Sequence, residues 1–90
     1  MSSRARGVYA ISVAAGLVRM EVQNLRVYER RGLLEPERTP GGTRLYSEAD
    51  LEVLHRIREL LAEGLNLAGI AKVLTLEDEV RRLRARLDGD

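Results

Sequence analysis

Apolar residues recur along the middle of the chain with the spacing of a helix. Four of them follow one another at intervals of three and four residues: Leu51, Leu54, Ile57 and Leu61. That spacing places them on one face and predicts an amphipathic helix. Ser47 opens this helix as its N-cap, with Glu48 and Asp50 favourably placed against the dipole of the first turn. Gly64 ends it.

Two shorter helices are predicted before this one. After a short extended segment at 9–11, Ser12 caps a helix with three apolar residues on one face: Val13, Leu17 and Val18. A tight turn at Arg19-Met20 leads into a second helix from about Glu21 to Arg31, with three residues facing inward: Val22, Leu25 and Tyr28. Gly32 ends this helix in the left-handed conformation. Two short helices joined by a tight turn are typical of a helix-turn-helix.

A small hairpin is predicted between the second and third helices. Glu37–Arg38 can pair with Thr43–Tyr46, and Pro40-Gly41-Gly42 supplies the turn. A hairpin directly after a helix-turn-helix is a wing, which can lie along a DNA backbone and place arginines on phosphates.

The last part of the chain is predicted to form two further helices. Asn66 caps a fourth helix that carries four apolar residues: Leu67, Ile70, Val73 and Leu74. Thr75 with Asp78 starts a fifth helix, on which apolar residues recur at intervals of four, three and four: Leu76, Val80, Leu83 and Leu87. This a/d pattern predicts a coiled-coil dimerisation seam. The alternative is that the same residues pack on the third helix within one chain.

Composition favours a helical fold and excludes several functions. Aromatic residues make up 3% of the chain, with no Phe and no Trp, so the core is expected to be aliphatic. The absence of Cys excludes disulfides, thiolate zinc sites and iron–sulfur clusters. The one histidine, His55, lies mid-helix among charged residues, and the serines lie near the terminus or at caps, so no catalytic triad is available. We therefore expect no enzyme, no metal site and no cofactor.

No targeting or membrane segment is recognisable. No apolar run approaches the roughly 18–20 residues that a membrane-spanning helix needs, and the N-terminal residues lack the features of a signal peptide. The sequence predicts a cytoplasmic protein.

Charge is distributed unevenly along the chain. Residues 1–47 carry eight arginines and four acidic residues, a net charge of +4, whereas residues 48–90 carry seven basic and ten acidic residues, a net charge of −3. The basic half contains the predicted helix-turn-helix and wing, which favours an anionic partner such as DNA.

Particular residues of the basic half are candidates for DNA contact. Gln23, Asn24 and Arg26 lie in the first turns of the second helix, where major-groove readers carry their base contacts. Arg38 and Arg44 flank the glycine tip of the wing and are candidates for phosphate contact, and Arg30 and Thr43 are further candidates for DNA contact. The alternative is a solvated helix whose arginines pair with nearby glutamates, with Tyr28 simply a core residue.

The segment "NLRVYERRGLLEPERTPGGTRLYSEADLEVLHRIRELLAEGLNLAGIAKVL" closely resembles the MerR family of bacterial transcription regulators, over about Tyr9 to Leu74. Within that family it is similar to the HspR heat-shock repressor type, with which it shares "ISVAA" at 11–15 and "GLNLAGI" at 64–70. The chain departs from the family pattern at two places. Position 21 is Glu, where the family usually has Ser or His, and the wing has fewer arginines.

The resemblance implies a mainly α winged helix-turn-helix that binds an inverted-repeat operator as a homodimer in a bacterial cytoplasm, associated with the nucleoid. It implies base contacts by Gln23, Asn24 and Arg26 and backbone contacts by three further residues: Tyr28, Arg44 and Tyr46. For the HspR type it also implies repression of chaperone genes with the chaperone DnaK as co-repressor.

On this interpretation residues 1–8 form a polar arm, residues 9–74 the DNA-binding domain and residues 75–90 the dimerisation helix. Two rival functions stay open: a MerR-like module that binds a chaperone in place of DNA, and an excisionase-like architectural DNA-binding protein.

Overall fold

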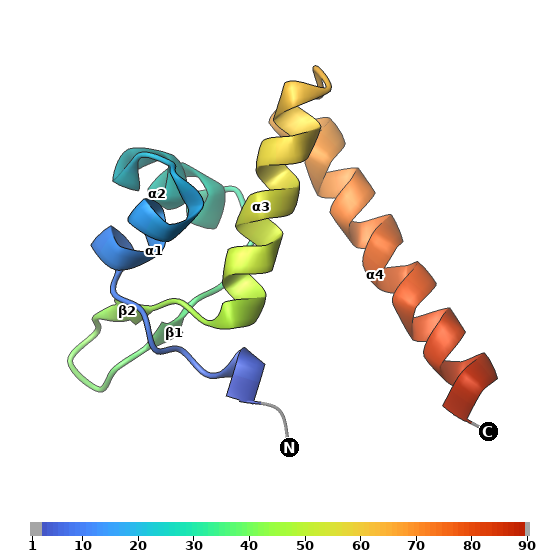
Figure 1. Ribbon diagram of the computed structural model, residues 1–90, viewed down its shortest axis with the longest axis horizontal. Coiled ribbons are helices and arrows are strands. Elements are labelled where there is room, and N and C mark those ends of the chain that lie inside the picture. Colours follow the sequence, from blue (N-terminus) through green and yellow to red (C-terminus); the bar gives the residue numbers. More distant parts are fainter. Residues whose placement is uncertain (1–2, 90) are drawn as a thin grey trace. The chain divides into compact units, whose positions relative to one another are not determined.

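A computed structural model describes residues 3–89 as helices and one short hairpin. The elements, in chain order, are η1 (Ser3–Ala5), α1 (Ile11–Val18), α2 (Val22–Arg30), β1 (Glu37–Arg38), β2 (Arg44–Leu45), α3 (Glu48–Ala62) and α4 (Leu67–Gly89) (Figure 1). The chain divides into two compact units, Met1–Arg58 and Glu59–Asp90, and the division falls within α3. The two units are described separately below. No helix within residues 3–89 is both long and apolar enough to cross a membrane.

In the first unit, α1 and α2 lie side by side as the predicted helix-turn-helix (Figure 1). The turn is made by Arg19, whose N–H donates to carbonyl oxygens at the end of α1 and whose left-handed backbone (φ 58°) redirects the chain after the helix. Met20 then donates its N–H to the carbonyl of Ala15 at 3.0 Å. The predicted tight turn at Arg19-Met20 is therefore confirmed.

The start of α1 differs from the prediction that Ser12 caps it. The N-cap is Ala10, without a side-chain hydrogen bond, and Ser12 lies exposed inside the first turn. The reason is a contact distant in sequence. Tyr9 exchanges two backbone hydrogen bonds with Tyr46, of 2.9 and 2.7 Å. This pairing holds the chain extended as far as Tyr9, so the helix begins directly after it.

The buried face of α1 also differs from the prediction. Val18 is buried as expected, but Val13 and Leu17 are 49% and 52% exposed. The core positions are instead taken by Ala14 and Ala15. Small side chains let two helices approach closely, and the hydrophobicity pattern alone does not reveal which face the neighbouring helix meets.

The end of α2 follows the prediction closely. Leu25 and Tyr28 are buried, and Gly32 has a left-handed backbone (φ 77°). The N–H groups of Gly32 and Leu33 donate to the carbonyls of Glu29 and Tyr28 at 2.9 and 3.0 Å, which satisfies the carbonyl groups left free at a helix end.

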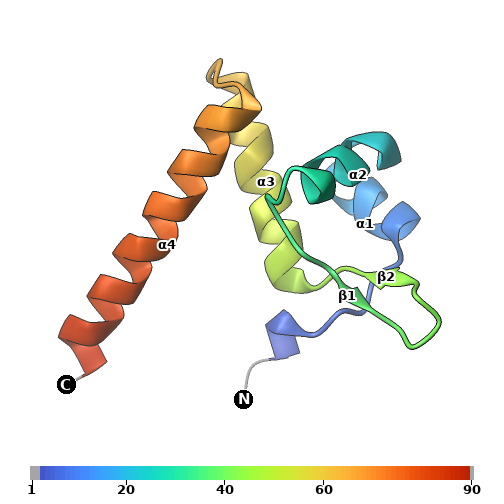
Figure 2. The same ribbon diagram turned by 180° about the vertical axis from the view of Figure 1, so that it is seen from behind.

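The predicted hairpin is present as an antiparallel pair in which Glu37 lies opposite Leu45 and Arg38 opposite Arg44. Its loop, which extends past the two strands in Figure 2, is closed by Thr39 and turns at Gly42 (φ 88°). The N-terminal segment packs against the hairpin: a Cβ at Gly7 would lie 2.6 Å from the carbonyl oxygen of Leu45, so only glycine fits there.

Ser47 caps α3, as the sequence predicts, and the structure adds that Asp50 returns the hydrogen bond in a reciprocal capping box. The Asp50 N–H donates to Ser47 Oγ and the Ser47 N–H to Asp50 Oδ2, both at 2.9 Å. Three of the four expected stripe residues are buried: Leu51, Leu54 and Ile57. The fourth expectation is wrong, because Leu61 is 38% exposed and Leu60 is buried in its place.

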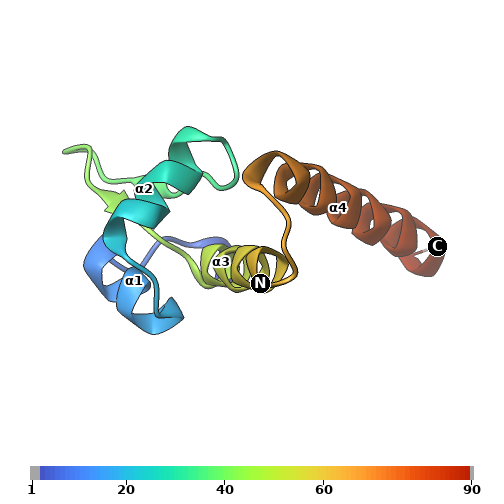
Figure 3. The same cartoon turned by 90° about the horizontal axis from the view of Figure 1, so that it is seen from above.

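In the second unit, Gly64 (φ 96°) ends the turn after α3, and the Asn66 side chain caps α4 by accepting the Gly69 N–H at 2.8 Å. Both features were predicted. The expected break between a fourth helix and a fifth at Thr75 is absent, and α4 runs uninterrupted (Figure 3). No glycine or proline lies between Gly69 and Gly89, so the helix has no residue at which to stop.

The four residues of the predicted seam lie exposed along α4. Leu76, Val80, Leu83 and Leu87 are 59%, 44%, 52% and 81% exposed. A solvated row of large aliphatic side chains at heptad spacing is the arrangement that a second helix covers in a coiled coil.

Candidate nucleic-acid interface

The outer face of α2 presents two of the three predicted base-reading residues, Gln23 and Arg26, together with Arg30. Gln23, Arg26 and Arg30 are all exposed and follow one another at three- and four-residue intervals, so they form one row along the helix. Asn24 is exposed too, but it lies outside this row, about 100° around the helix from Gln23. Leu25 and the opposite face are buried, which fixes this row toward solvent.

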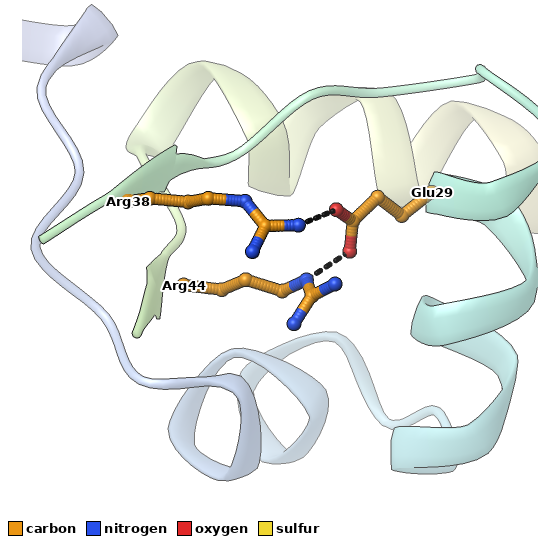
Figure 4. A network of polar contacts seen from close by, with 3 residues as sticks. All are labelled: Glu29, Arg38 and Arg44. Atoms are coloured by element: carbon orange, nitrogen blue, oxygen red, sulfur yellow. Dashed lines mark hydrogen bonds and ion pairs between the residues drawn. The ribbon is translucent and has the colours of Figure 1, made fainter. Parts of the chain in front are cut away.

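The wing joins this helix through Glu29. Arg38 Nη2, from β1, lies 3.3 Å from Glu29 Oε2, and Arg44 Nε, from β2, donates to Glu29 Oε1. Figure 4 shows both arginines reaching from the hairpin toward the one carboxylate. The Glu29 side chain is 17% exposed, against 35% for Arg44 and 52% for Arg38. The carboxylate is thus largely covered, whereas the guanidinium groups remain open to solvent.

This network corrects the alternative interpretation in which the α2 arginines pair with their neighbouring glutamates. Within residues 3–89 the ion pairs of Glu29 are made with the wing arginines, and no ion pair is found for Arg26 or Arg30. From the sequence, Glu29 was considered only as a residue that could neutralise a nearby arginine. Its role in joining two elements was missed, because nothing local shows that the hairpin folds back onto the last turn of α2.

The residues around Glu29 enclose a hollow of about 330 Å³, lined by Arg26, Glu29, Arg30, Arg38 and Arg44. Four guanidinium groups surround one carboxylate, so the hollow is strongly positive. Arginine presents a planar set of N–H donors that suits phosphate oxygens. The hollow therefore has the size and charge to take a phosphate group of a nucleic-acid backbone.

Two predicted backbone-contacting tyrosines lie inside the domain. Tyr28 is 5% exposed and Tyr46 is fully buried, with no hydrogen-bond partner for its hydroxyl. Burial raises the pKa of both side chains, and the nearby Glu29 carboxylate raises the pKa of Tyr46 further. Their direct contact with DNA stays a prediction, and the observed burial favours a core role. Thr43 is exposed near the wing tip.

The buried Tyr46 hydroxyl leads to a first expected result. Tyr46→Phe should leave the free energy of unfolding unchanged or raise it by up to about 1 kcal/mol, because it removes a buried polar group without a partner. The affinity for duplex DNA should not change. Chemical denaturation and a DNA titration measure the two quantities, and a tenfold weaker affinity with unchanged stability would restore the direct contact.

The tyrosines also predict how stability depends on pH. Because the pKa values of Tyr28 and Tyr46 are raised in the folded protein, the folded state holds their protons to higher pH than the unfolded state does. Their contribution is therefore complete below the ordinary tyrosine pKa of about 10 and is lost as pH rises above it. Denaturation midpoints from pH 8 to 12 should fall above pH 10, and less steeply in Tyr46→Phe.

Residues 3–89 contain no group of three His, Asp or Glu side chains placed to hold a metal ion.

Comparison with known proteins agrees with this arrangement. The family model of the MerR HTH family regulatory proteins matches residues 9–77. The chain belongs to the MerR family. This confirms the resemblance seen in the sequence, together with its mainly α, winged helix-turn-helix DNA-binding domain.

Two curated relatives illustrate the similarity. The chain is 49% identical over 80 residues to a putative heat shock protein HspR of Streptomyces coelicolor, covering 88% of this chain and 53% of that protein. It is 44% identical over 73 residues to a probable heavy metal-dependent transcriptional regulator of Haemophilus influenzae, covering 80% of this chain and 57% of that protein. The chain thus spans little more than half the length of these relatives.

Solved MerR structures share the fold. A MerR-family transcriptional regulator from Bacillus cereus superposes with a TM-score of 0.71 at 30% identity, over 89% of this chain and 64% of that one. HiNmlR, a MerR family regulator that lacks the sensor domain and is bound to promoter DNA, superposes with a TM-score of 0.69 at 27% identity, over 90% of this chain and 64% of that one.

Proposed function

We propose that this MerR-family chain is a sequence-specific DNA-binding regulator of transcription that acts as a homodimer on an inverted repeat. The observation that carries the proposal is the Glu29 network, which joins the exposed row of α2 and the two wing arginines into one positively charged surface. Both wing arginines line the same hollow as Arg26 and Arg30, and an anionic ligand suits this concentration of positive charge.

On this surface the two elements have different tasks. The row of Gln23, Arg26 and Arg30 enters the major groove, where Gln and Arg side chains can pair with adenine and guanine edges. The remaining N–H groups of Arg38 and Arg44 bind the flanking backbone, which orients the helix without reading sequence. Glu21 precedes α2 as its N-cap and makes no side-chain hydrogen bond to the first turn of the helix.

The homodimer is proposed from α4. Its four exposed seam residues give a narrow apolar stripe that a second copy can cover, and the two helices pair antiparallel as the family resemblance implies. In such a dimer the length of α4 sets the distance between the two reading helices and hence the spacing of the half-sites.

The regulated genes are proposed from similarity alone. One relative is named a putative heat shock protein HspR, and this supports a repressor of heat-shock or chaperone genes. The chaperone DnaK as co-repressor follows from the same resemblance. Purified DnaK should then increase the protein's affinity for its operator, and an affinity unaffected by the chaperone would remove this part of the proposal.

The function is tested by selection from a pool of random DNA duplexes at two salt concentrations, followed by sequencing of the bound fraction. An inverted repeat should emerge, with affinity falling steeply as salt rises because phosphate contacts release counterions. Salt-sensitive binding without an enriched sequence would indicate an architectural protein. No binding would leave the protein-interaction module.

A further inference from the structure

Glu29 occupies the point where three elements of the interface meet. It lies in the last turns of α2, three residues after Arg26, and its two carboxylate oxygens bind different strands of the wing. Oε1 accepts from Arg44 on β2, and Oε2 accepts from Arg38 on β1 (Figure 4). A single side chain therefore fixes both strands of the hairpin to the reading helix.

The hairpin needs such a partner. Arg38 and Arg44 lie directly opposite each other, and the hairpin contains only two residue pairs. Like charges in opposite positions of an antiparallel pair destabilise it. A carboxylate between the two guanidinium groups removes this repulsion and at the same time selects the side-chain conformation of each arginine.

The contact leaves both arginines able to bind a further anion. Arginine carries five N–H donors, and each of these two side chains uses one of them on Glu29. Arg44 engages through Nε, which leaves both of its terminal nitrogens for the hollow that Arg26 and Arg30 also line. Glu29 thus orients the wing arginines without occupying them.

We propose that Glu29 is a positioning residue for DNA specificity. By holding Arg38 and Arg44 against α2, it fixes the wing relative to this helix. The wing can then contact the DNA backbone and α2 can contact the bases at the same time in only one alignment of the protein along the duplex. This inference rests on the proposed function. Glu29 touches no base in this scheme, and its negative charge opposes binding to any duplex. Its benefit appears only in the preference for the correct sequence over others.

Two variants of the full-length chain separate these effects. Glu29→Gln keeps the side-chain size but removes the charge that holds both arginines. Glu35→Gln is the matched control, because Glu35 is exposed and lies outside the hollow, so the variant makes the same change in net charge without touching the network. Each protein is titrated by fluorescence anisotropy against the duplex selected from the random pool and against a scrambled duplex of equal length, at several salt concentrations.

Glu29→Gln should lower the ratio of selected to scrambled affinity by about tenfold, the loss expected for hydrogen bonds to a charged group. Its affinity for the scrambled duplex should equal or exceed that of the wild type, since the protein gains positive charge. Glu35→Gln should leave the ratio unchanged.

Four results overturn the inference. If Glu29→Gln weakens binding to both duplexes together with its thermal midpoint, the residue has only a structural role. If it strengthens binding to both duplexes equally, the residue is only a repulsive charge. If the wild type prefers no duplex, the proposed function fails as well, whereas a wild-type preference that Glu29→Gln retains defeats the inference alone.

Arg44→Lys provides an independent test should Glu29→Gln fold poorly. Lysine keeps the charge but lacks the planar group that binds Glu29 and the hollow together. The variant should also lose about tenfold in the affinity ratio. The double variant should lose no more than either single one, because both act through the same contact. Additive losses would show that the two residues act independently.

Discussion

Leu83→Glu is expected to convert the proposed homodimer into a monomer and to weaken binding to the selected inverted repeat by at least about 100-fold. Leu83 lies in the middle of the exposed row on α4 and is 52% exposed in the single chain. Covering a charged side chain with a second helix removes it from water without a partner, which opposes association. Two linked half-sites bind far more tightly than one, so loss of the dimer removes that gain.

Sedimentation measures the oligomeric state. Titrations of the protein against a full operator and against a single half-site measure how much the second half-site adds to the affinity. Ala85→Glu is the control, because Ala85 is exposed on α4 and lies outside the seam. It adds the same charge and should leave the dimer intact. A dimer that survives Leu83→Glu would place the interface elsewhere, and the exposed Val13 and Leu17 of α1 would then be the first residues to change.

Arg26→Ala is expected to reduce the free energy of binding to the selected duplex by about 1–3 kcal/mol, the discrimination that a bidentate base contact provides. Arg26 lies exposed on the outer row of α2 and lines the positive hollow. If Arg26 reads a guanine, the loss of binding free energy depends on the DNA sequence. Replacing that base pair should weaken binding of the wild-type protein by a similar amount. The same replacement should not change binding of the Arg26→Ala variant.

Arg31→Ala is the matched control for this experiment, because Arg31 is exposed just after α2 and lies outside the hollow. It removes the same charge and should weaken binding to all sequences by a similar small factor, with a shallower dependence on salt. If Arg26→Ala also weakens every duplex to the same degree, Arg26 contacts phosphate and does not read a base.

Several features of the fold could be predicted from the sequence because each depends on residues close together in the chain. The Ser47 cap, the Asn66 cap, the left-handed Gly32 and the helix end at Gly64 were all found where expected. A side-chain cap or a positive φ is set by the conformational preferences of a few consecutive residues. The order of these signals was enough to predict a helix-turn-helix followed by a wing.

The sequence also predicted which side chains of α2 face outward and which face inward. Gln23, Asn24 and Arg26 were expected to face outward, and Leu25 and Tyr28 inward, since a helix of known limits assigns each residue to a face. The sequence also determined the positive charge of residues 1–47 and the family to which the chain belongs.

Where the local sequence allowed more than one helix start or more than one buried position, only the tertiary structure decided between them. Ser12 is a good N-cap, but the pairing of Tyr9 with Tyr46 starts α1 earlier. Leu60 and Leu61 are equally hydrophobic neighbours, and only packing shows that Leu60 is the buried one.

The same limit applies to the interface. The sequence supplied Glu29, Arg38 and Arg44 as separate charges, and whether a carboxylate pairs within its own helix or across to a hairpin depends on how the chain folds back. Local sequence therefore determined the elements and the residues they expose. The long-range contacts between elements decided the buried face of α1, the burial of Tyr46 and the bracing of the wing by Glu29, because such contacts depend on the relative positions of segments that lie far apart in the chain.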